Sequence, residues 1–146
     1  MDSIRQFVQD EVERQGWERE SPAFWLRVGA MLAAWNHAIG TVRLTAKTVR
    51  LWGQMVEPEV NSSGWRTCNV RVGQSTCPDW QDVPRLVAQW VDGQYNLSPD
   101  ETYLEFERIH PFRDGNGRVG KIVHNWRLKT LLVPVLVRDY FGGGNP

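Results

Sequence analysis

A short stretch late in the chain groups residue types that act on phosphates. From Ile109 to Lys121 the sequence reads IHPFRDGNGRVGK, with an imidazole, a carboxylate, an amide between two glycines, and cations. Glycines allow backbone conformations closed to other residues, and successive N–H groups in such a turn form an anion-binding concavity. A helix that begins near Gly117 would point its positive end at the same place. We therefore predict a loop that holds polyphosphate.

Each polar side chain of this stretch suits one role. His110 titrates near neutral pH and could take a proton from an incoming hydroxyl. Asp114 offers the hard oxygen that Mg²⁺ takes when it also binds substrate phosphates. Asn116 could donate to a phosphate oxygen, and the planar fork of Arg118 could grip a phosphate, with Lys121 on the same helix face. A His before Pro, or a D-G or N-G step, alone indicates only a turn. Their combination in one loop favours a site.

The stretch from His110 to Arg118 resembles the motif of Fic-domain proteins, H-x-F-x-(D/E)-G-N-G-R-x-x-R. Every defined position through Arg118 is present, whereas Lys121 stands where the family usually has a second Arg. The resemblance implies a mainly α, Fic-fold helical bundle. It also implies an enzyme that transfers AMP from ATP to a Ser, Thr or Tyr hydroxyl of a target protein.

The resemblance further implies a role for each motif residue. His110 would be the general base, Phe112 would anchor the loop in the core, and Asp114 would hold Mg²⁺. Residues 115–117 would form an anion hole around the α-phosphate, and Arg118 would hold the outer phosphates. The implied nucleotide-binding set is Asp114, Gly115, Asn116, Gly117, Arg118 and Lys121.

Lys121 leaves alternatives open. Lysine is a compact point charge, while arginine makes a forked phosphate contact. Weak activity, transfer of another phosphate-containing group, or a Fic-like module that only binds nucleotide or protein all remain open.

Regulation is a second departure from the family. Many members carry an inhibitory helix, (S/T)-x-x-x-E-(G/N), whose Glu pairs with the second Arg. Here no Ser or Thr is followed by Glu at the fourth position. Either a separate antitoxin-like protein supplies that Glu, or the protein is unrestrained and never used this switch.

A second pattern lies upstream of the motif. From Trp65 to Gly73, β-favouring residues alternate with polar ones before a turn, which predicts a hairpin over residues 66–77. A simple surface hairpin is one interpretation. Fic proteins carry a similar β-hairpin flap, often G-x-Y/W-R followed by V-x-V/I-G, whose edge pairs with an extended segment of the target. By resemblance the flap covers about 65–78, and its docking residues are Cys68, Asn69, Val70, Arg71, Val72 and Gly73.

Helical patterns account for most of the remaining chain. An N-terminal helix includes Ile4, Phe7 and Val8. Further helices begin at Ser21-Pro22, Thr45, Asp82-Val83-Pro84 and Ser98-Pro99, and the last runs from about Gly117 to Leu132 before Pro134. The helix that Gly40 ends should bury a stripe made of Trp25, Val28, Leu32, Trp35 and Ile39.

Length and composition set the outer limits. The 146 residues suit one domain, which we divide into an N-terminal helical extension, 1–20, and a Fic domain, 21–146. The formal net charge of zero indicates no nucleic-acid surface. With no signal peptide and only short apolar runs, we expect no membrane span and a cytoplasmic, toxin-like protein, or one delivered into a host cell. Cys68 and Cys77 are expected to be reduced thiols.

Overall fold

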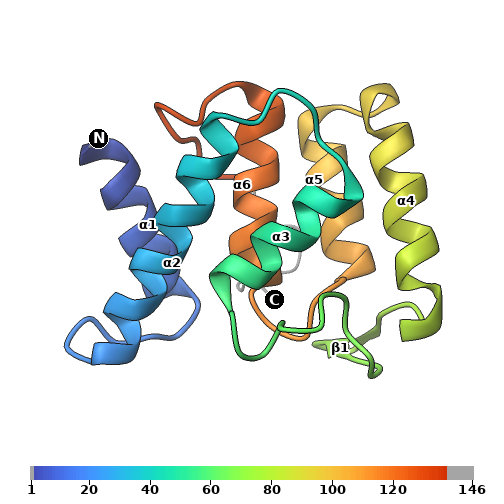
Figure 1. Ribbon diagram of the computed structural model, residues 1–146, viewed down its shortest axis with the longest axis horizontal. Helices are drawn as coiled ribbons and strands as arrows, with labels where there is room; N and C mark the ends of the chain where they lie inside the picture. The colour runs from blue at the N-terminus through green and yellow to red at the C-terminus, as the bar shows by residue number, and fades with distance from the viewer. Residues whose placement is uncertain (1, 138–146) are drawn as a thin grey trace.

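The computed structural model of the chain describes residues 2–137 (Figure 1). Within these residues the chain forms six α-helices and one two-stranded antiparallel sheet, which confirms the mainly α fold class. The helices are α1 (Asp2–Arg14), α2 (Pro22–Ile39), α3 (Ala46–Val56), α4 (Val83–Gly93), α5 (Pro99–Ile109) and α6 (Asn116–Leu128). The strands are β1 (Arg71–Val72) and β2 (Ser75–Thr76), and single 3-10 turns, η1 (Trp80–Asp82) and η2 (Gln94–Asn96), flank α4.

Side-chain caps start several helices where the sequence predicts them. Ser21 accepts a hydrogen bond from the backbone N–H of Phe24 at the start of α2. Thr45 caps α3 in the same way. At α5, Ser98 and Glu101 form the reciprocal capping box. Local sequence therefore fixes these boundaries.

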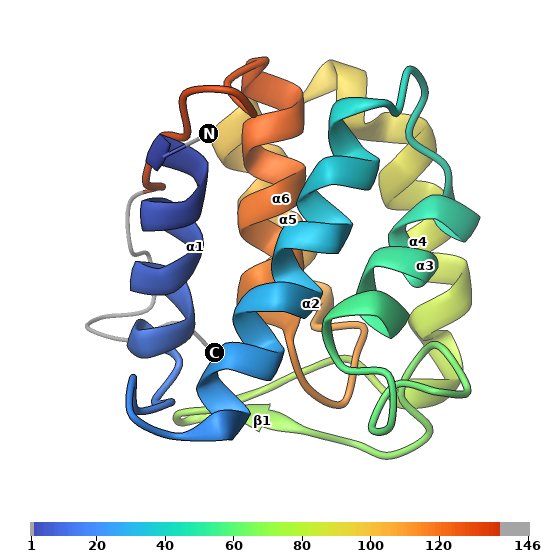
Figure 2. The same cartoon turned by 60° about the vertical axis from the view of Figure 1, so that its left-hand side comes forward.

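Helix α6 lies at the centre of the bundle. It packs against α5, α2 and α3, while α4 packs on α5 and α1 packs on α2 (Figures 1 and 2). The predicted N-terminal helix is α1, and its buried side chains join the common core rather than forming a separate layer. The members from α1 are Ile4, Val8 and Val12. No described helix is long and apolar enough to cross a membrane.

The predicted apolar stripe of α2 is wrong in part. Trp25 and Ile39 are exposed, whereas Val28 and Trp35 are buried as expected. Helix α2 contacts α1, α3 and α6, so its buried face is wider than one stripe. This face is turned toward those three helices. The buried residues are Phe24, Val28, Met31, Ala34, Trp35 and Ala38.

Helix α6 ends earlier than predicted. Lys129 adopts a left-handed conformation with φ 63°, and the chain then folds back onto the helix. The buried amide of Asn125 holds this return, because it accepts from the N–H of Val135 at 2.8 Å and from the hydroxyl of Thr130 at 2.7 Å. These contacts, which sequence periodicity does not reveal, stop the helix before Pro134.

The predicted hairpin exists, but its strands are much shorter than predicted. Arg71 pairs with Thr76 and Val72 with Ser75, around a turn in which Gly73 has φ 59°. Residues 66–70 are not strand. Arg66 turns inward instead and is buried. The tail from Asp139 to Pro146, whose sequence predicts a turn or a frayed end, lies outside the described residues.

Candidate functional site

The predicted helix–loop–helix around the motif is present at one end of the bundle. The loop joins α5 to α6 at the lower edge of Figure 1, next to the hairpin. His110 ends α5 in a left-handed conformation, φ 51° and ψ 63°. Gly115 precedes α6 with φ 81°. These two residues therefore set the bends that bring the loop back across the helix ends.

The start of α6 has no side-chain cap. Gly115 occupies the capping position and makes no side-chain hydrogen bond there. The first-turn N–H groups of an α-helix have no intrahelical partner, and they carry its positive pole. This end of α6 can therefore hold an anion, which fits the prediction for residues 115–117. A side chain would not fit at Gly115, because its Cβ would lie 2.9 Å from Cγ2 of Val56.

Asn116 closes the loop through its side chain. Its Oδ1 accepts from the N–H of Phe112 at 2.9 Å, and its Nδ2 donates to the carbonyl of Phe112 at 2.8 Å. Both ends of the amide are thus used within the loop. The group that Asn116 can still offer a phosphate is its backbone N–H at the start of α6.

Phe112 is fully buried, as expected of an anchor. Its ring lies 5.3 Å from that of Trp65 and 6.5 Å from that of Phe106. It also lies directly over Gly53 of α3, where any Cβ would collide with the ring. The loop is therefore seated on α3 as well as on its own two helices.

His110 is held neutral by its surroundings. The residue is only 8% exposed, and burial lowers the pKa of its imidazole to about 4. Within the described part of the chain, its Nδ1 has no hydrogen-bond partner. Because a neutral imidazole can accept a proton, the group is in the form that a general base needs.

Arg66 ties the hairpin region to the motif loop. Its guanidinium donates to the carbonyls of His110 at 2.7 Å, Ile109 at 3.2 Å, Cys68 at 3.0 Å and Pro78 at 2.6 Å. Four backbone oxygens thus share one buried cation. This explains why the residues around Arg66 do not extend as a strand. Although the sequence match of the flap includes Arg66, that match gave no indication of this function.

Asp114 is an exposed polar group of the motif. Its side chain is 50% exposed, and its Oδ1 accepts from the N–H of Gly115 at 2.8 Å. Its carbonyl accepts from Nδ2 of Asn61 at 2.8 Å, which fixes the backbone. The described residues contain no group of three or more side chains able to hold a metal. A Mg²⁺ at Asp114 would therefore take its other oxygens from nucleotide or water, as Mg²⁺ commonly does.

Arg118 lies beside two carboxylates. It is buried, and its Nη2 lies 2.7 Å from Oε2 of Glu57 and 3.8 Å from Oδ1 of Asp114. Glu57 ends α3 and had no predicted role. Together, Glu57 and Asn61 make the end of α3 a support for the motif loop.

Lys121 points to a different partner. Its Nζ lies 3.4 Å from Oε2 of Glu11 in α1 and 3.3 Å from the hydroxyl of Tyr103. Burial lowers the pKa of this lysine, while Glu11 opposes that effect. The chain thus supplies a carboxylate at Lys121. The sequence pattern missed it because Phe7 and Val12 stand where the inhibitory-helix pattern needs Ser or Thr and Gly or Asn.

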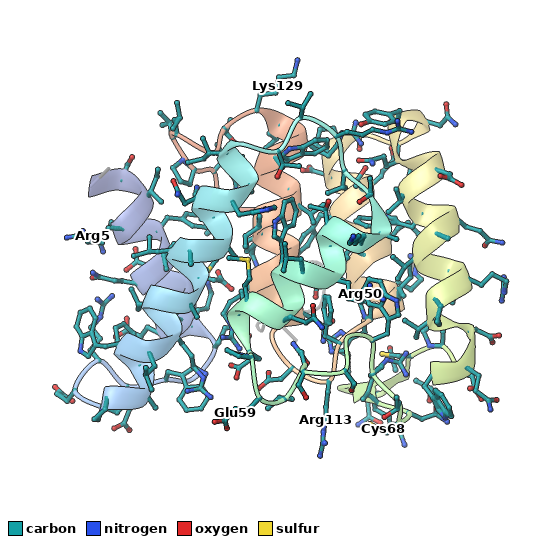
Figure 3. All side chains as sticks on the ribbon, viewed as in Figure 1. Arg5, Arg50, Glu59, Cys68, Arg113 and Lys129 are labelled. Carbon is teal, nitrogen blue, oxygen red and sulfur yellow. The ribbon has the colours of Figure 1, made fainter. Side chains whose placement is uncertain are left out.

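The hairpin lies at the same end of the molecule as the motif loop. In Figure 3 the labelled Cys68 and Arg113 both lie at this end, with Arg113 directed away from the bundle. Arg71 is exposed, and Oδ1 of Asn69 accepts from the N–H of Trp80. Cys68 and Cys77 are both free thiols, the first exposed and the second buried. The predicted flap residues therefore lie near the loop.

Comparisons with known proteins agree with this arrangement. Residues 43–128, more than half of the chain, match the Fic/DOC family. A Fic family protein from Desulfovibrio desulfuricans G20 superposes with a TM-score of 0.71 at 18% identity, over 88% of this chain and 48% of its own. A Fic domain-containing signaling protein from Bacteroides thetaiotaomicron VPI-5482 gives 0.70 at 16% identity, over 94% and 66%.

This chain therefore spans about half the length of the first of these proteins. At these identities the structural matches show a shared fold. The match of residues 43–128 contains the whole motif loop and the flap. The chain belongs to the Fic/DOC family.

Proposed function

We propose that this protein is a Fic-type transferase that moves AMP from ATP to a hydroxyl side chain of a target protein. Family membership supports transferase activity, since the Fic/DOC family generally carries it. The observation that carries the finer proposal is the loop itself. A buried, neutral His110 begins the same loop that ends at the uncapped positive pole of α6.

The proposed reaction is a displacement at the α-phosphorus of ATP. The target hydroxyl oxygen bonds to that phosphorus as His110 takes the hydroxyl proton, and the bond to the departing pyrophosphate breaks. The first-turn N–H groups of α6 hold the α-phosphate oxygens as charge builds on them. Asp114 would hold Mg²⁺, which would neutralise charge on the phosphates.

The flap supplies the proposed docking place for the target. Residues 68–73 lie at the motif end of the bundle, and the two short strands leave backbone groups beyond their own pairing. An extended target segment that pairs with this edge would register its hydroxyl by backbone hydrogen bonds. The proposed partner is therefore a protein with an accessible extended stretch.

We also propose that the restraining carboxylate at Lys121 is Glu11 of this same chain. The pair is buried, so a phosphate that used the charge of Lys121 would compete with Glu11. A separate antitoxin-like inhibitor is then unnecessary for this contact. The pair suggests that Lys121 takes the regulatory part that the second motif Arg takes in the family.

A labelling experiment tests the transfer. The protein is incubated with Mg²⁺, cell lysate and ATP that carries the label on either the α- or the γ-phosphate. We expect protein-bound α-label and no γ-label. His110→Ala should reduce the label by about 10²- to 10⁴-fold, the range for loss of a general base. His37→Ala is the matched control, because His37 is exposed and lies outside the motif.

Other outcomes separate the alternatives. Protein-bound γ-label that depends on His110 would replace AMP transfer by phosphate transfer. Label that appears only with Lys121→Arg would favour a binding module with little turnover. No label with any variant, together with no ATP binding, would overturn the proposal.

A further inference from the structure

A line of alternating charges runs from the surface of α2 to the motif loop. The guanidinium of Arg27 stacks 3.5 Å from the ring centroid of Trp17. Its Nε lies 2.9 Å from Oε2 of Glu57, and its Nη2 lies 3.3 Å from Oε1. The same Oε2 of Glu57 accepts from Nη2 of Arg118 at 2.7 Å. One carboxylate therefore joins two guanidinium groups.

Glu57 is firmly placed. Its side chain is 6% exposed, and its backbone N–H donates to the carbonyl of Gly53 at the end of α3. A buried carboxylate is costly unless it is paired and hydrogen-bonded. Salt bridges to Arg27 and Arg118 meet that requirement. Glu57 therefore links α2 to α6 while it holds Arg118.

Arg118 has a second carboxylate within reach. Its Nη2 lies 3.8 Å from Oδ1 of Asp114, compared with 2.7 Å from Glu57. Its Nη1 makes a long contact, 3.4 Å, to the carbonyl of Val56. A small rotation of the guanidinium away from Glu57 would pair it with Asp114. Glu57 and Asp114 thus compete for the same cation.

We infer that Glu57 is a positioning residue of the nucleotide site, which keeps Arg118 off Asp114 so that Asp114 is available to Mg²⁺. This inference rests on the proposed function, because it assumes that Mg²⁺ and nucleotide bind at the motif loop. Glu57 touches neither of them and acts through Arg118. The negative charge of Glu57 also offsets the positive charge of Arg118, and this lowers the net positive charge near the nucleotide phosphates.

Glu57→Gln keeps the shape of the side chain and removes its charge. The substitution removes one negative charge from beside the loop, so ATP should bind more tightly in the absence of Mg²⁺. With Mg²⁺, Arg118 now pairs with Asp114, so more Mg²⁺ is needed for half-maximal ATP binding. We expect each change to be roughly fivefold, the size of a modest charge–charge coupling. If Glu57 had a purely structural role, the substitution would weaken ATP binding both with and without Mg²⁺.

Arg27→Gln should shift ATP binding without Mg²⁺ in the opposite direction. Glu57 then has Arg118 as its remaining guanidinium partner and holds it more firmly, and the region loses one positive charge. ATP should bind more weakly without Mg²⁺, while the Mg²⁺ requirement does not rise. The side chain of Arg27 is 21% exposed and belongs to α2, outside the motif loop. Glu59→Gln is the matched control, because Glu59 is exposed on the same segment (Figure 3).

The test is calorimetric titration of ATP into the wild type and the three variants, in EDTA and at a series of Mg²⁺ concentrations. Thermal melts report whether each variant is folded. The inference is supported if Glu57→Gln binds ATP more tightly in EDTA and needs more Mg²⁺ for half-maximal binding, while Glu59→Gln shows neither change. Parallel weakening, or no change, in Glu57→Gln overturns it while wild-type binding leaves the proposed function intact.

Two further results are decisive. If the wild type binds no ATP under either condition, the proposed function fails and this inference fails with it. If Glu57→Gln does not fold, Arg27→Gln decides: weaker binding in EDTA at an unchanged Mg²⁺ requirement supports the inference, and unchanged binding overturns it.

Discussion

At the scale of single residues, His110 combines two constraints. Its backbone is bent into a left-handed turn, and its ring lies in a place where charge is disfavoured. The motif residues span the end of α5, the connecting loop and the start of α6, because they are contiguous in the sequence. Glu57, Asn61 and Arg66 were not predicted as support for this loop, because each lies far from it in the chain and matters only through tertiary contacts.

The depressed pKa of His110 gives a prediction about pH. The folded imidazole should stay neutral from pH 8 down to about 5, whereas an ordinary imidazole would protonate near 6.5. In that interval the unfolded chain takes up a proton that the folded one does not, so stability should fall as pH falls from about 6.5 to 4. NMR titration of the imidazole, assigned with His110→Ala, checks this. A midpoint near 6.5 would contradict it.

At the scale of elements, two helices outside the motif determine how the loop works. Helix α3 provides Gly53 under Phe112 and Glu57 beside Arg118. Helix α1 provides Glu11 beside Lys121. The capping signals predict where helices start. They do not show which helix end meets which loop, since that depends on how the bundle packs.

Glu11→Gln tests the part played by α1. Removing this charge should release Lys121 for nucleotide phosphates and raise ATP affinity by roughly fivefold, the size of a modest charge pair. Glu13→Gln is the control, because Glu13 lies on the same helix and pairs with Arg19 at the surface. The measurement is calorimetric titration of ATP with Mg²⁺. Unchanged or weaker binding would show that Glu11 does not compete with nucleotide.

At the scale of the whole molecule, three ionisable groups meet between α1, α5 and α6. Burial raises the pKa of Glu107 to about 8, despite the nearby Lys121, and Glu11 adds to the rise. Neither carboxyl oxygen of Glu107 has a hydrogen-bond partner among the described residues. Glu107 should therefore be protonated at neutral pH. Periodicity placed it on the helix that leads into the motif, but gave no sign of this burial.

Glu107 gives a stability prediction. Above pH 4.5 the folded chain keeps a proton on Glu107 that the unfolded chain loses. The contribution of Glu107 to stability is therefore complete below pH 4.5 and is lost as pH rises to about 8. The slope is about 1.4 kcal/mol per pH unit for one proton. Glu107→Gln should remove this decline. Chemical denaturation at pH 5 and pH 8 measures it, with Glu105→Gln at an exposed position of α5 as control.

The order of helices and their starts could thus be predicted from capping residues and apolar spacing. The details that failed share one cause. The α2 stripe, the end of α6 and the length of the hairpin strands all depend on contacts between distant segments, through α6, Asn125 and Arg66 respectively. Patterns in a single sequence report local conformational preference, whereas packing between distant segments determined these three features.

The seating of the loop on α3 has a consequence for engineering. A graft of residues 109–121 into another helical hairpin would carry the imidazole and the carboxylate, but leave behind the floor under Phe112 and the partner of Arg118. The transplanted segment would have no template for its shape. The smallest transferable unit therefore includes residues 53–61, although residues 62–108 separate the two pieces in the sequence.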